Sequence, residues 1–231
     1  MRLKIFLLLS LTMFIFLNSC SDNDSPQTPT DKKVKIIVLA DPHFFLSTLH
    51  DDGPAFRAAA LADRKMMAES PAIFDAALSA ILAEKPDIVI IPGDLTKDGE
   101  ELSHLAVAEK LSALVRAGIK VIVAPGNHDI NNESACSYSG SNSTKINSVN
   151  DNRFAEIYSD FGFSSAIYRD ASSLSYICEP AEGIWVASID ATRHNGEENW
   201  VGGTLKNSTQ NWLFAKLAEG LAVIAHAPPP R

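Results

Sequence analysis

Short apolar runs alternate with longer amphipathic segments from residue 34 onward, and this alternation limits the possible folds more than any other feature of the chain. The runs at residues 34–40, 87–91 and 119–124 are rich in Val and Ile, as buried strands are. The segments between them, 70–84 and 100–117, carry apolar residues at helical spacing. Repeated strand–helix–strand order predicts an α/β fold in which helices cover a parallel or mixed sheet.

The second half of the chain continues the same order of elements. It predicts strands at residues 175–178, 184–189 and 221–225 and helices at 152–161 and 208–218. Residues 131–150 are rich in Asn, Ser and Gly, and we expect them to form an exposed loop. On the helix 100–117 we expect His104 on the solvated surface, and one side made of Leu102, Leu105, Ala106, Leu111, Leu114 and Val115.

The first 19 residues have the pattern of a secretory signal peptide, which we expect to lie outside the folded domain. Arg2 and Lys4 precede an uncharged apolar run over residues 5–17. This run is too short to cross a bilayer core of about 30 Å, which needs about 20 helical residues. It fits the charged region and the apolar region of a signal peptide.

The sequence Leu-Asn-Ser-Cys at residues 17–20 resembles a bacterial lipobox, in which the signal is cut before the cysteine and the cysteine is acylated. The alternative is an ordinary signal peptide in which Cys20 is incidental. Residues 20–33 are small, acidic and Pro-containing, which predicts a solvated tether. We therefore expect an extracytoplasmic lipoprotein, at the periplasm or cell surface, anchored to a bacterial membrane through Cys20. Its folded domain would span residues 34–231.

The net charge and the cysteine content argue against a general nucleic-acid-binding protein and against a fold stabilised by many disulfides. Lys plus Arg number 20 against 28 Asp plus Glu, a net charge of −8, which argues against a general affinity for nucleic acid. Three cysteines are too few for a disulfide scaffold. If Cys20 is acylated, Cys136 and Cys178 are the only possible disulfide pair, and the sequence favours neither the paired nor the free state.

Polar residues follow the predicted strands, at the edge where open α/β sheets bind ligands. Asp41 and His43 follow the first strand, Asp94 the second, and Gly-Asn-His-Asp at 126–129 the third; Asp190 and His226 follow two later strands. Carboxylate and imidazole ligands without thiolates suit Mn, Fe or Zn. Two such ions about 3.5–4 Å apart can generate hydroxide and hold a phosphoryl group. The sequence therefore predicts a dinuclear metallohydrolase site.

These motifs, in this order, resemble the calcineurin-like metallophosphoesterases, and the resemblance covers the chain from residue 34 to its end. The stretch Gly-Asp-Leu-Thr-Lys-Asp-Gly-Glu at 93–100 and the Trp-Leu pair at 212–213 resemble the branch that contains cyclic-nucleotide phosphodiesterases. The resemblance implies an α/β/β/α fold, a β-sandwich flanked by helices. It also implies hydrolysis of phosphate monoesters or diesters, of small molecules or nucleotides, by metal-bound hydroxide. Specificity would lie in loops such as 44–63 and 131–150.

The resemblance further implies a role for each site residue. The metal ligands would be Asp41 and His43 at the first ion, Asp94 bridging both ions, and Asn127 and His226 at the second. His128 would not bind metal but would face the scissile phosphate, stabilising charge or protonating the leaving oxygen. Asp129 would accept a hydrogen bond from the His128 ring and orient it.

The chain departs from the family pattern at its end. Family members carry a Gly-His-x-His motif some tens of residues after the isolated histidine. This sequence stops at Arg231, five residues after His226, and contains no His-x-His. We therefore expect a truncated member that lacks its C-terminal strands and has weakened activity. The alternative function is an inactive lipoprotein that retains only metal or phosphate binding.

Overall fold

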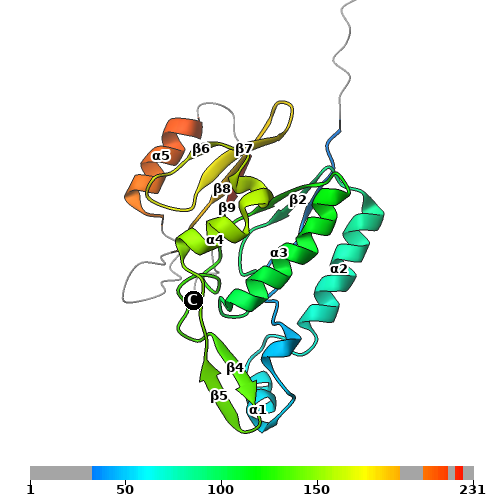
Figure 1. Cartoon of the computed structure of the whole chain (residues 1–231). Coiled ribbons are helices and arrows are strands. Elements are labelled where there is room, and N and C mark those ends of the chain that lie inside the picture. The colour runs from blue at the N-terminus through cyan, green and yellow to red at the C-terminus, as the bar shows by residue number, and fades with distance from the viewer. Residues whose placement is uncertain (1–32, 193–204, 218–221, 226–231) are drawn as a thin grey trace, which may run out of the picture. The chain divides into compact units, whose positions relative to one another are not determined.

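The computed structural model in Figure 1 describes residues 33–192, 205–217 and 222–225. Two predicted site residues, Cys20 and His226, lie outside these ranges. The chain divides into two units, Met1–Lys33 and Val34–Arg231, and the fold described below belongs to the second. None of the helices within the described ranges has the length and apolar character needed to cross a membrane.

The first sheet is parallel and has the strand order β1-β2-β3. Its strands are β1 (Ile36–Val38), β2 (Ile88–Ile91) and β3 (Lys120–Val123). The helices α2 (Ser70–Glu84) and α3 (Glu101–Arg116) connect these strands and pack side by side (Figure 1). Every residue of β2 is buried, because this strand has a neighbour on each side and a covered face above and below. The strands and helices predicted for this half are confirmed, but β1 is an edge strand in which Ile36 and Val38 are exposed and not buried.

A smaller group of elements lies at the end of the domain where α2 and α3 begin (Figure 1). It contains the turn η1 (Ser47–Leu49), the helix α1 (Pro54–Ala62) and a hairpin of β4 (Cys136–Ser139) and β5 (Asn142–Lys145), which contact one another (Figure 1). The prediction of an exposed loop over 131–150 is therefore wrong in part, because two strands form within it. The two strands are short and polar, so they show no alternation of apolar residues. They are stabilised by pairing with each other and by packing of Tyr138 against a buried cluster of Phe45, Leu49, Phe56 and Met67, here called the aromatic cluster.

The second sheet has the order β6-β7-β8-β9. It contains β6 (Ala166–Arg169), β7 (Tyr176–Ala181) and β8 (Ile184–Ile189), which are antiparallel, and β9 (Ala222–Ala225), which is parallel to β8. The helix α5 (Asn207–Leu217) covers one face of this sheet. Its Leu213 side chain packs against Ile177, Ala187 and Ile189.

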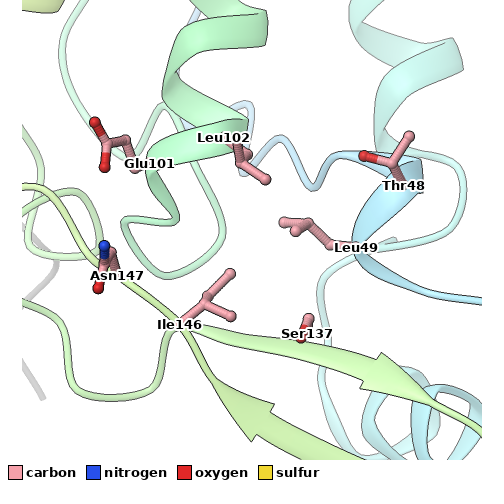
Figure 2. A pocket seen from close by; sticks show the side chains of 7 residues that line it. All are labelled: Thr48, Leu49, Glu101, Leu102, Ser137, Ile146 and Asn147. Atoms are coloured by element: carbon pink, nitrogen blue, oxygen red, sulfur yellow. The ribbon is translucent and has the colours of Figure 1, made fainter.

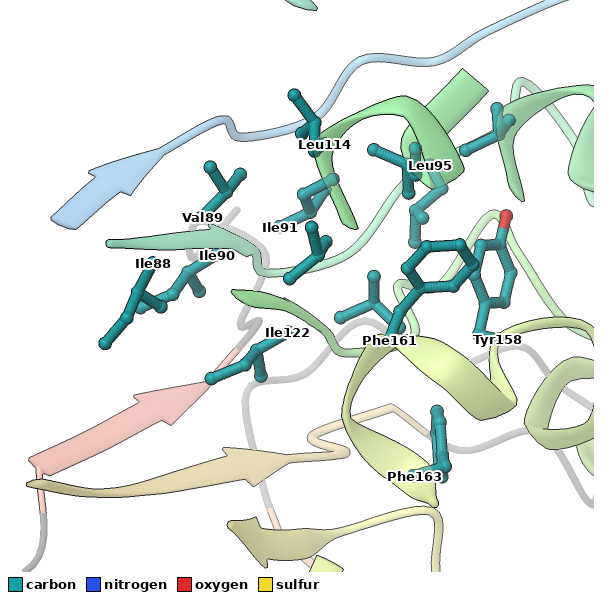
Figure 3. Packing of buried hydrophobic residues seen from close by; sticks show 14 of the residues in the cluster. Ile88, Val89, Ile90, Ile91, Leu95, Leu114, Ile122, Tyr158, Phe161 and Phe163 are labelled. Atoms are coloured by element: carbon teal, nitrogen blue, oxygen red, sulfur yellow. The ribbon is translucent and has the colours of Figure 1, made fainter. Parts of the chain in front are cut away.

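The opposite face of the second sheet shares a core with the first sheet. Cys178 and Val186 belong to the same buried cluster as the side chains of β2 and β3. The helix α4 (Asp151–Ile157) and the helical turn η2 (Ser159–Phe163) complete this cluster, and Figure 3 shows Phe161 and Phe163 of η2 beside side chains of the first sheet. Cys178 here and Cys136 in β4 are both free thiols. The arrangement of two sheets with outer helices confirms the predicted α/β/β/α fold.

Candidate metal centre

The loops after β1 and β2 run side by side and bring three predicted ligands together. The His43 amide donates to the Asp94 carbonyl oxygen at 2.9 Å, and the Phe44 amide donates to the Leu95 carbonyl oxygen at 3.0 Å. The pairing of the two strands thus continues past the end of the sheet. As a result, ligand atoms of Asp41, His43 and Asp94 all lie within 4.8 Å of one another.

The backbone is strained at each of these three residues. Asp41, His43 and Asp94 have φ values of 49°, 42° and 47°, in the left-handed region. For residues other than glycine this conformation is uncommon, and it costs on the order of 1–3 kcal/mol per residue. Such strain gathers at sites where function fixes the geometry. Here it coincides with three converging donor groups.

The donor set fits a divalent cation. His43 Nδ1 is buried and has no hydrogen-bond partner in the described part of the chain, and His43 Nε2 lies 3.7 Å from Asp94 Oδ2. Burial lowers the pKa of His43 to about 4, although the Asp94 charge raises it. The imidazole is therefore neutral near pH 7, which is the form that binds metal. A neutral imidazole between two carboxylates suits Mn, Fe or Zn.

The turn after β3 closes around Asp94. The His128 amide donates to Asp94 Oδ1 at 3.0 Å. A Cβ atom on Gly126 would lie 2.1 Å from the Asp94 amide nitrogen, so this position needs glycine. Asn127, the predicted ligand of a second ion, lies between these two residues in the turn. Its predicted partner ligand, His226, lies outside the described residues, so a second ion stays a prediction.

Asp129 holds the loops of the site together. Its fully buried carboxylate accepts hydrogen bonds from the amides of Leu95 at 3.1 Å, Thr96 at 2.9 Å and Gly126 at 2.8 Å. Burial, with the Asp94 charge nearby, raises the pKa of Asp129 to about 7. The predicted bond from the His128 ring to Asp129 is wrong, because backbone amides already occupy both of its carboxylate oxygens.

Asp98 takes the place predicted for Asp129. Its Oδ1 lies 2.9 Å from His128 Nδ1, and its carboxylate also accepts from Lys97 Nζ and, at 3.3 Å, from Asn132 Nδ2. Burial lowers the pKa of His128, but the hydrogen bond to Asp98 and the charge of Asp94 have a larger effect in the opposite direction. The pKa of His128 is therefore raised above its ordinary value. Burial raises the pKa of Asp98, but the bonds from His128 and Lys97 outweigh this effect, so Asp98 is ionised. The His128 ring meets the His43 ring edge-on at 5.0 Å between centroids.

His104 lies behind the site and not on the surface, so that prediction is also wrong. It is fully buried, with its Nε2 2.9 Å from the Asp129 carbonyl oxygen and its Nδ1 2.8 Å from the Tyr158 hydroxyl. Burial lowers its pKa to about 3. The buried residues of α3 are Ser103, His104, Val107, Leu111 and Leu114. Leu102 and Leu105, predicted to be packed, are 51% and 41% exposed.

A cavity of about 460 Å³ lies between η1, the start of α3 and the β4–β5 hairpin (Figure 2). Its lining residues are Thr48, Leu49, Glu101, Leu102, Ser137, Ile146 and Asn147. Both segments that we expect to set specificity, 44–63 and 131–150, contribute to this lining. The three converging ligands do not line it.

Asp98 and Lys65 are site residues that the sequence reasoning missed. Asp98 lies inside the motif 93–100, where a carboxylate four residues after Asp94 was the available signal. Lys65 lies between two helices with no motif around it.

Among protein families, the model of the calcineurin-like phosphoesterases matches residues 34–231. A search of curated proteins gives no match to the chain.

Proposed function

Because the chain belongs to the calcineurin-like phosphoesterase family, whose members are hydrolases that act on phosphoester bonds, we propose that it hydrolyses phosphate monoesters or diesters at a dinuclear metal centre. The observation that carries this proposal is the convergence of Asp41, His43 and Asp94 beside the His128–Asp98 pair. Asn127 and His226 would complete the ligand set. Divalent Mn, Fe or Zn ions held there would supply a hydroxide nucleophile and stabilise charge on the phosphoryl oxygens.

The position of Asp94 supports its role as the bridging ligand. Its Oδ2 faces His43, whereas its Oδ1 accepts from the His128 amide in the turn that contains Asn127. The carboxylate thus lies between the His43 ring and the backbone of the turn that contains Asn127. A carboxylate in this position can bind two cations at once.

The pairing of His128 and Asp98 supports proton donation to the leaving group. Because Nδ1 is held by Asp98, we assign proton transfer to Nε2, which lies 3.3 Å from Lys65 Nζ. The charge of Asp98 favours the protonated ring, so His128 holds a proton that it can give to the departing oxygen. Asp98 acts through His128 and is therefore a positioning residue.

We also propose that the mature protein is a membrane-anchored lipoprotein that acts outside the cytoplasm on small-molecule or nucleotide phosphoesters. The charged and apolar segments of residues 1–17 and the following Cys20 support this location. Labelled fatty acid should enter the wild-type protein but not the Cys20→Ala variant. Wild-type protein that takes up no label would contradict the lipid anchor.

Hydrolysis assays test the enzymatic proposal. With millimolar Mn²⁺, the full chain should hydrolyse p-nitrophenyl phosphate or bis(p-nitrophenyl) phosphate, and a chelator should abolish the reaction. A cyclic nucleotide added to the substrate panel tests the phosphodiesterase branch. Asp94→Ala should remove activity, whereas Asp75→Ala, at a half-exposed surface ion pair with Lys110, should not. Metal binding without hydrolysis of any substrate would favour the inactive, ligand-binding alternative.

A further inference from the structure

Lys65, between α1 and α2, places a positive charge against the His128 ring. Its Nζ lies 3.1 Å from His128 Nδ1 and 3.3 Å from His128 Nε2. An ammonium group donates hydrogen bonds but cannot accept them, and the Nδ1 hydrogen is directed to Asp98. Lys65 therefore places a positive charge within hydrogen-bond distance of the ring to which the proposed function assigns contact with the phosphoryl group.

The neighbouring Lys97 is a lysine whose charge is matched by carboxylates. Its Nζ pairs with Asp98 and, at 3.4 Å, with Asp63. Lys65 Nζ has no carboxylate oxygen within 4.0 Å among the described residues, and its other contact is the Lys97 carbonyl oxygen at 3.5 Å. Burial lowers the pKa of Lys65, although the nearby aspartates raise it. Lys65 is therefore a partly buried cation whose charge is not matched by a paired carboxylate.

The segment that carries Lys65 is fastened to the segment that carries His43. The Met67 amide donates to the Lys65 carbonyl oxygen at 2.9 Å. The Met67 side chain is buried in the aromatic cluster with Phe45 and Phe56. The Ser70 hydroxyl donates to the Met67 carbonyl oxygen at 3.1 Å and accepts from the Phe45 amide at 2.9 Å. Phe45 is two residues from His43. The backbone that carries Lys65 is thus linked through Met67 and Ser70 to the segment that carries His43.

We propose that Lys65 and His128 together bind phosphoryl oxygens of the substrate, and that Lys65 makes the site favour dianionic phosphomonoesters over monoanionic phosphodiesters. This inference rests on the proposed function and deepens it. A monoester carries close to two negative charges near pH 7, because its second pKa is about 6, whereas a diester carries one. The Coulomb energy with a fixed cation grows in proportion to the substrate charge. Removal of the Lys65 charge should therefore weaken monoester recognition more than diester recognition.

The test compares substrates that share a leaving group but differ in charge. We would measure kcat/KM for p-nitrophenyl phosphate and bis(p-nitrophenyl) phosphate in the Mn²⁺-loaded full chain and in Lys65→Met, Lys65→Arg and Arg64→Met variants. Arg64 is the matched control, because it is an exposed cation on the same segment. If Lys65→Met lowers the diester value about tenfold, the doubled charge of the monoester predicts a loss of about a hundredfold. Lys65→Arg should keep most of the monoester preference, and Arg64→Met should match the wild type.

Binding of inorganic phosphate provides a readout that does not depend on turnover. Calorimetry on the metal-loaded protein should show phosphate binding about tenfold or more weaker in Lys65→Met, with metal content unchanged. Equal losses for both substrates, or equal phosphate affinity in Lys65→Met and wild type, would overturn the inference. If Lys65→Met does not fold, Lys65→Gln is measured by the same criteria. Absence of hydrolysis by the wild type would contradict the proposed function alone, since the phosphate measurement would still decide the role of Lys65.

Discussion

His128 is held by Asp98, and the consequence of losing that carboxylate depends on the leaving group. An Asp98→Asn variant keeps the side-chain shape but removes the charge that stabilises the protonated ring. General acid catalysis contributes about 10²–10⁴ to rate, so we expect kcat to fall at least about tenfold for phenyl phosphate. The loss should be smaller for p-nitrophenyl phosphate, whose leaving group needs less protonation. Metal content should not change. Equal losses for both substrates would contradict the assigned role.

Glu100 links the stability of the fold to pH. It is 1% exposed, its Oε2 accepts from the Asp98 amide at 3.2 Å, and its Oε1 has no partner in the described part of the chain. Burial raises its pKa from 4.5 to about 7. The folded state thus binds this proton more tightly than the unfolded state, and stability is lost as pH rises from 4.5 through 7. This loss amounts to about 3 kcal/mol at pH 8.

A Glu100→Gln variant should therefore be more stable than the wild type at pH 8, but not at pH 4.5. Denaturant unfolding at the two pH values measures both free energies. Glu101→Gln is the control, because Glu101 is partly exposed and paired with Arg153, and its difference from wild type should change little with pH. A Glu100→Gln variant that is less stable than the wild type at pH 8 would contradict the cost assigned to this buried charge.

Sequence position could predict some site residues and not others. Asp41, His43, Asp94 and His128 directly follow strands, and the backbone alone carries them to one edge of the sheet. The choice of Asp98 over Asp129 as the partner of His128 depends on which carboxylate is already occupied by backbone amides. That competition is settled only by the packed loops, so the sequence could not reveal it.

At the scale of elements, the site depends on the close approach of the loops after β2 and β3. Gly126→Ala would place a Cβ atom 2.2 Å from Asp94 Oδ1, and so displace the carboxylate proposed to bridge the metals. We expect this variant to lose metal binding in elemental analysis. Gly183→Ala is the control, because its φ is 75° but no atom lies within 4 Å of the added Cβ. It should cost about 1 kcal/mol of stability and leave metal binding intact. Normal metal content in Gly126→Ala would contradict the role of this approach.

Long helices and apolar strands were predicted well, whereas short or polar elements were missed. The predicted helix 70–84 and strand 184–189 match α2 and β8. The helix α1 was missed because it is short and rich in Ala, and Phe56 is its one buried side chain. The packed face of α3 was predicted correctly at Leu111 and Leu114 but not at Leu102 and Leu105, which are exposed. Near the start of this helix the polar Ser103 and His104 are buried instead, so hydrophobicity alone points to the wrong residues there.

At the scale of the whole molecule, the ligands come from separate loops and meet only in the folded chain. Metal should therefore bind the folded state and stabilise it. At 100 times the dissociation constant this stabilisation is about 2.7 kcal/mol, which raises the melting temperature of a domain of this size by about 5–10 °C. Thermal unfolding with and without chelator measures the shift. Asp94→Ala should melt at the same temperature in both conditions, and a full metal-dependent shift in that variant would contradict the ligand assignment.

The most direct test of a metal-dependent phosphoesterase site compares Asp94→Ala with His128→Ala. Metal content per chain and hydrolysis of p-nitrophenyl phosphate and bis(p-nitrophenyl) phosphate are measured on both variants and on the wild type. We predict that Asp94→Ala loses metal and activity together, because one carboxylate serves the whole centre. His128→Ala should retain metal but lose activity, because its ring donates a proton and binds no ion. Equal metal content in the two variants, or full activity in either, would contradict the account.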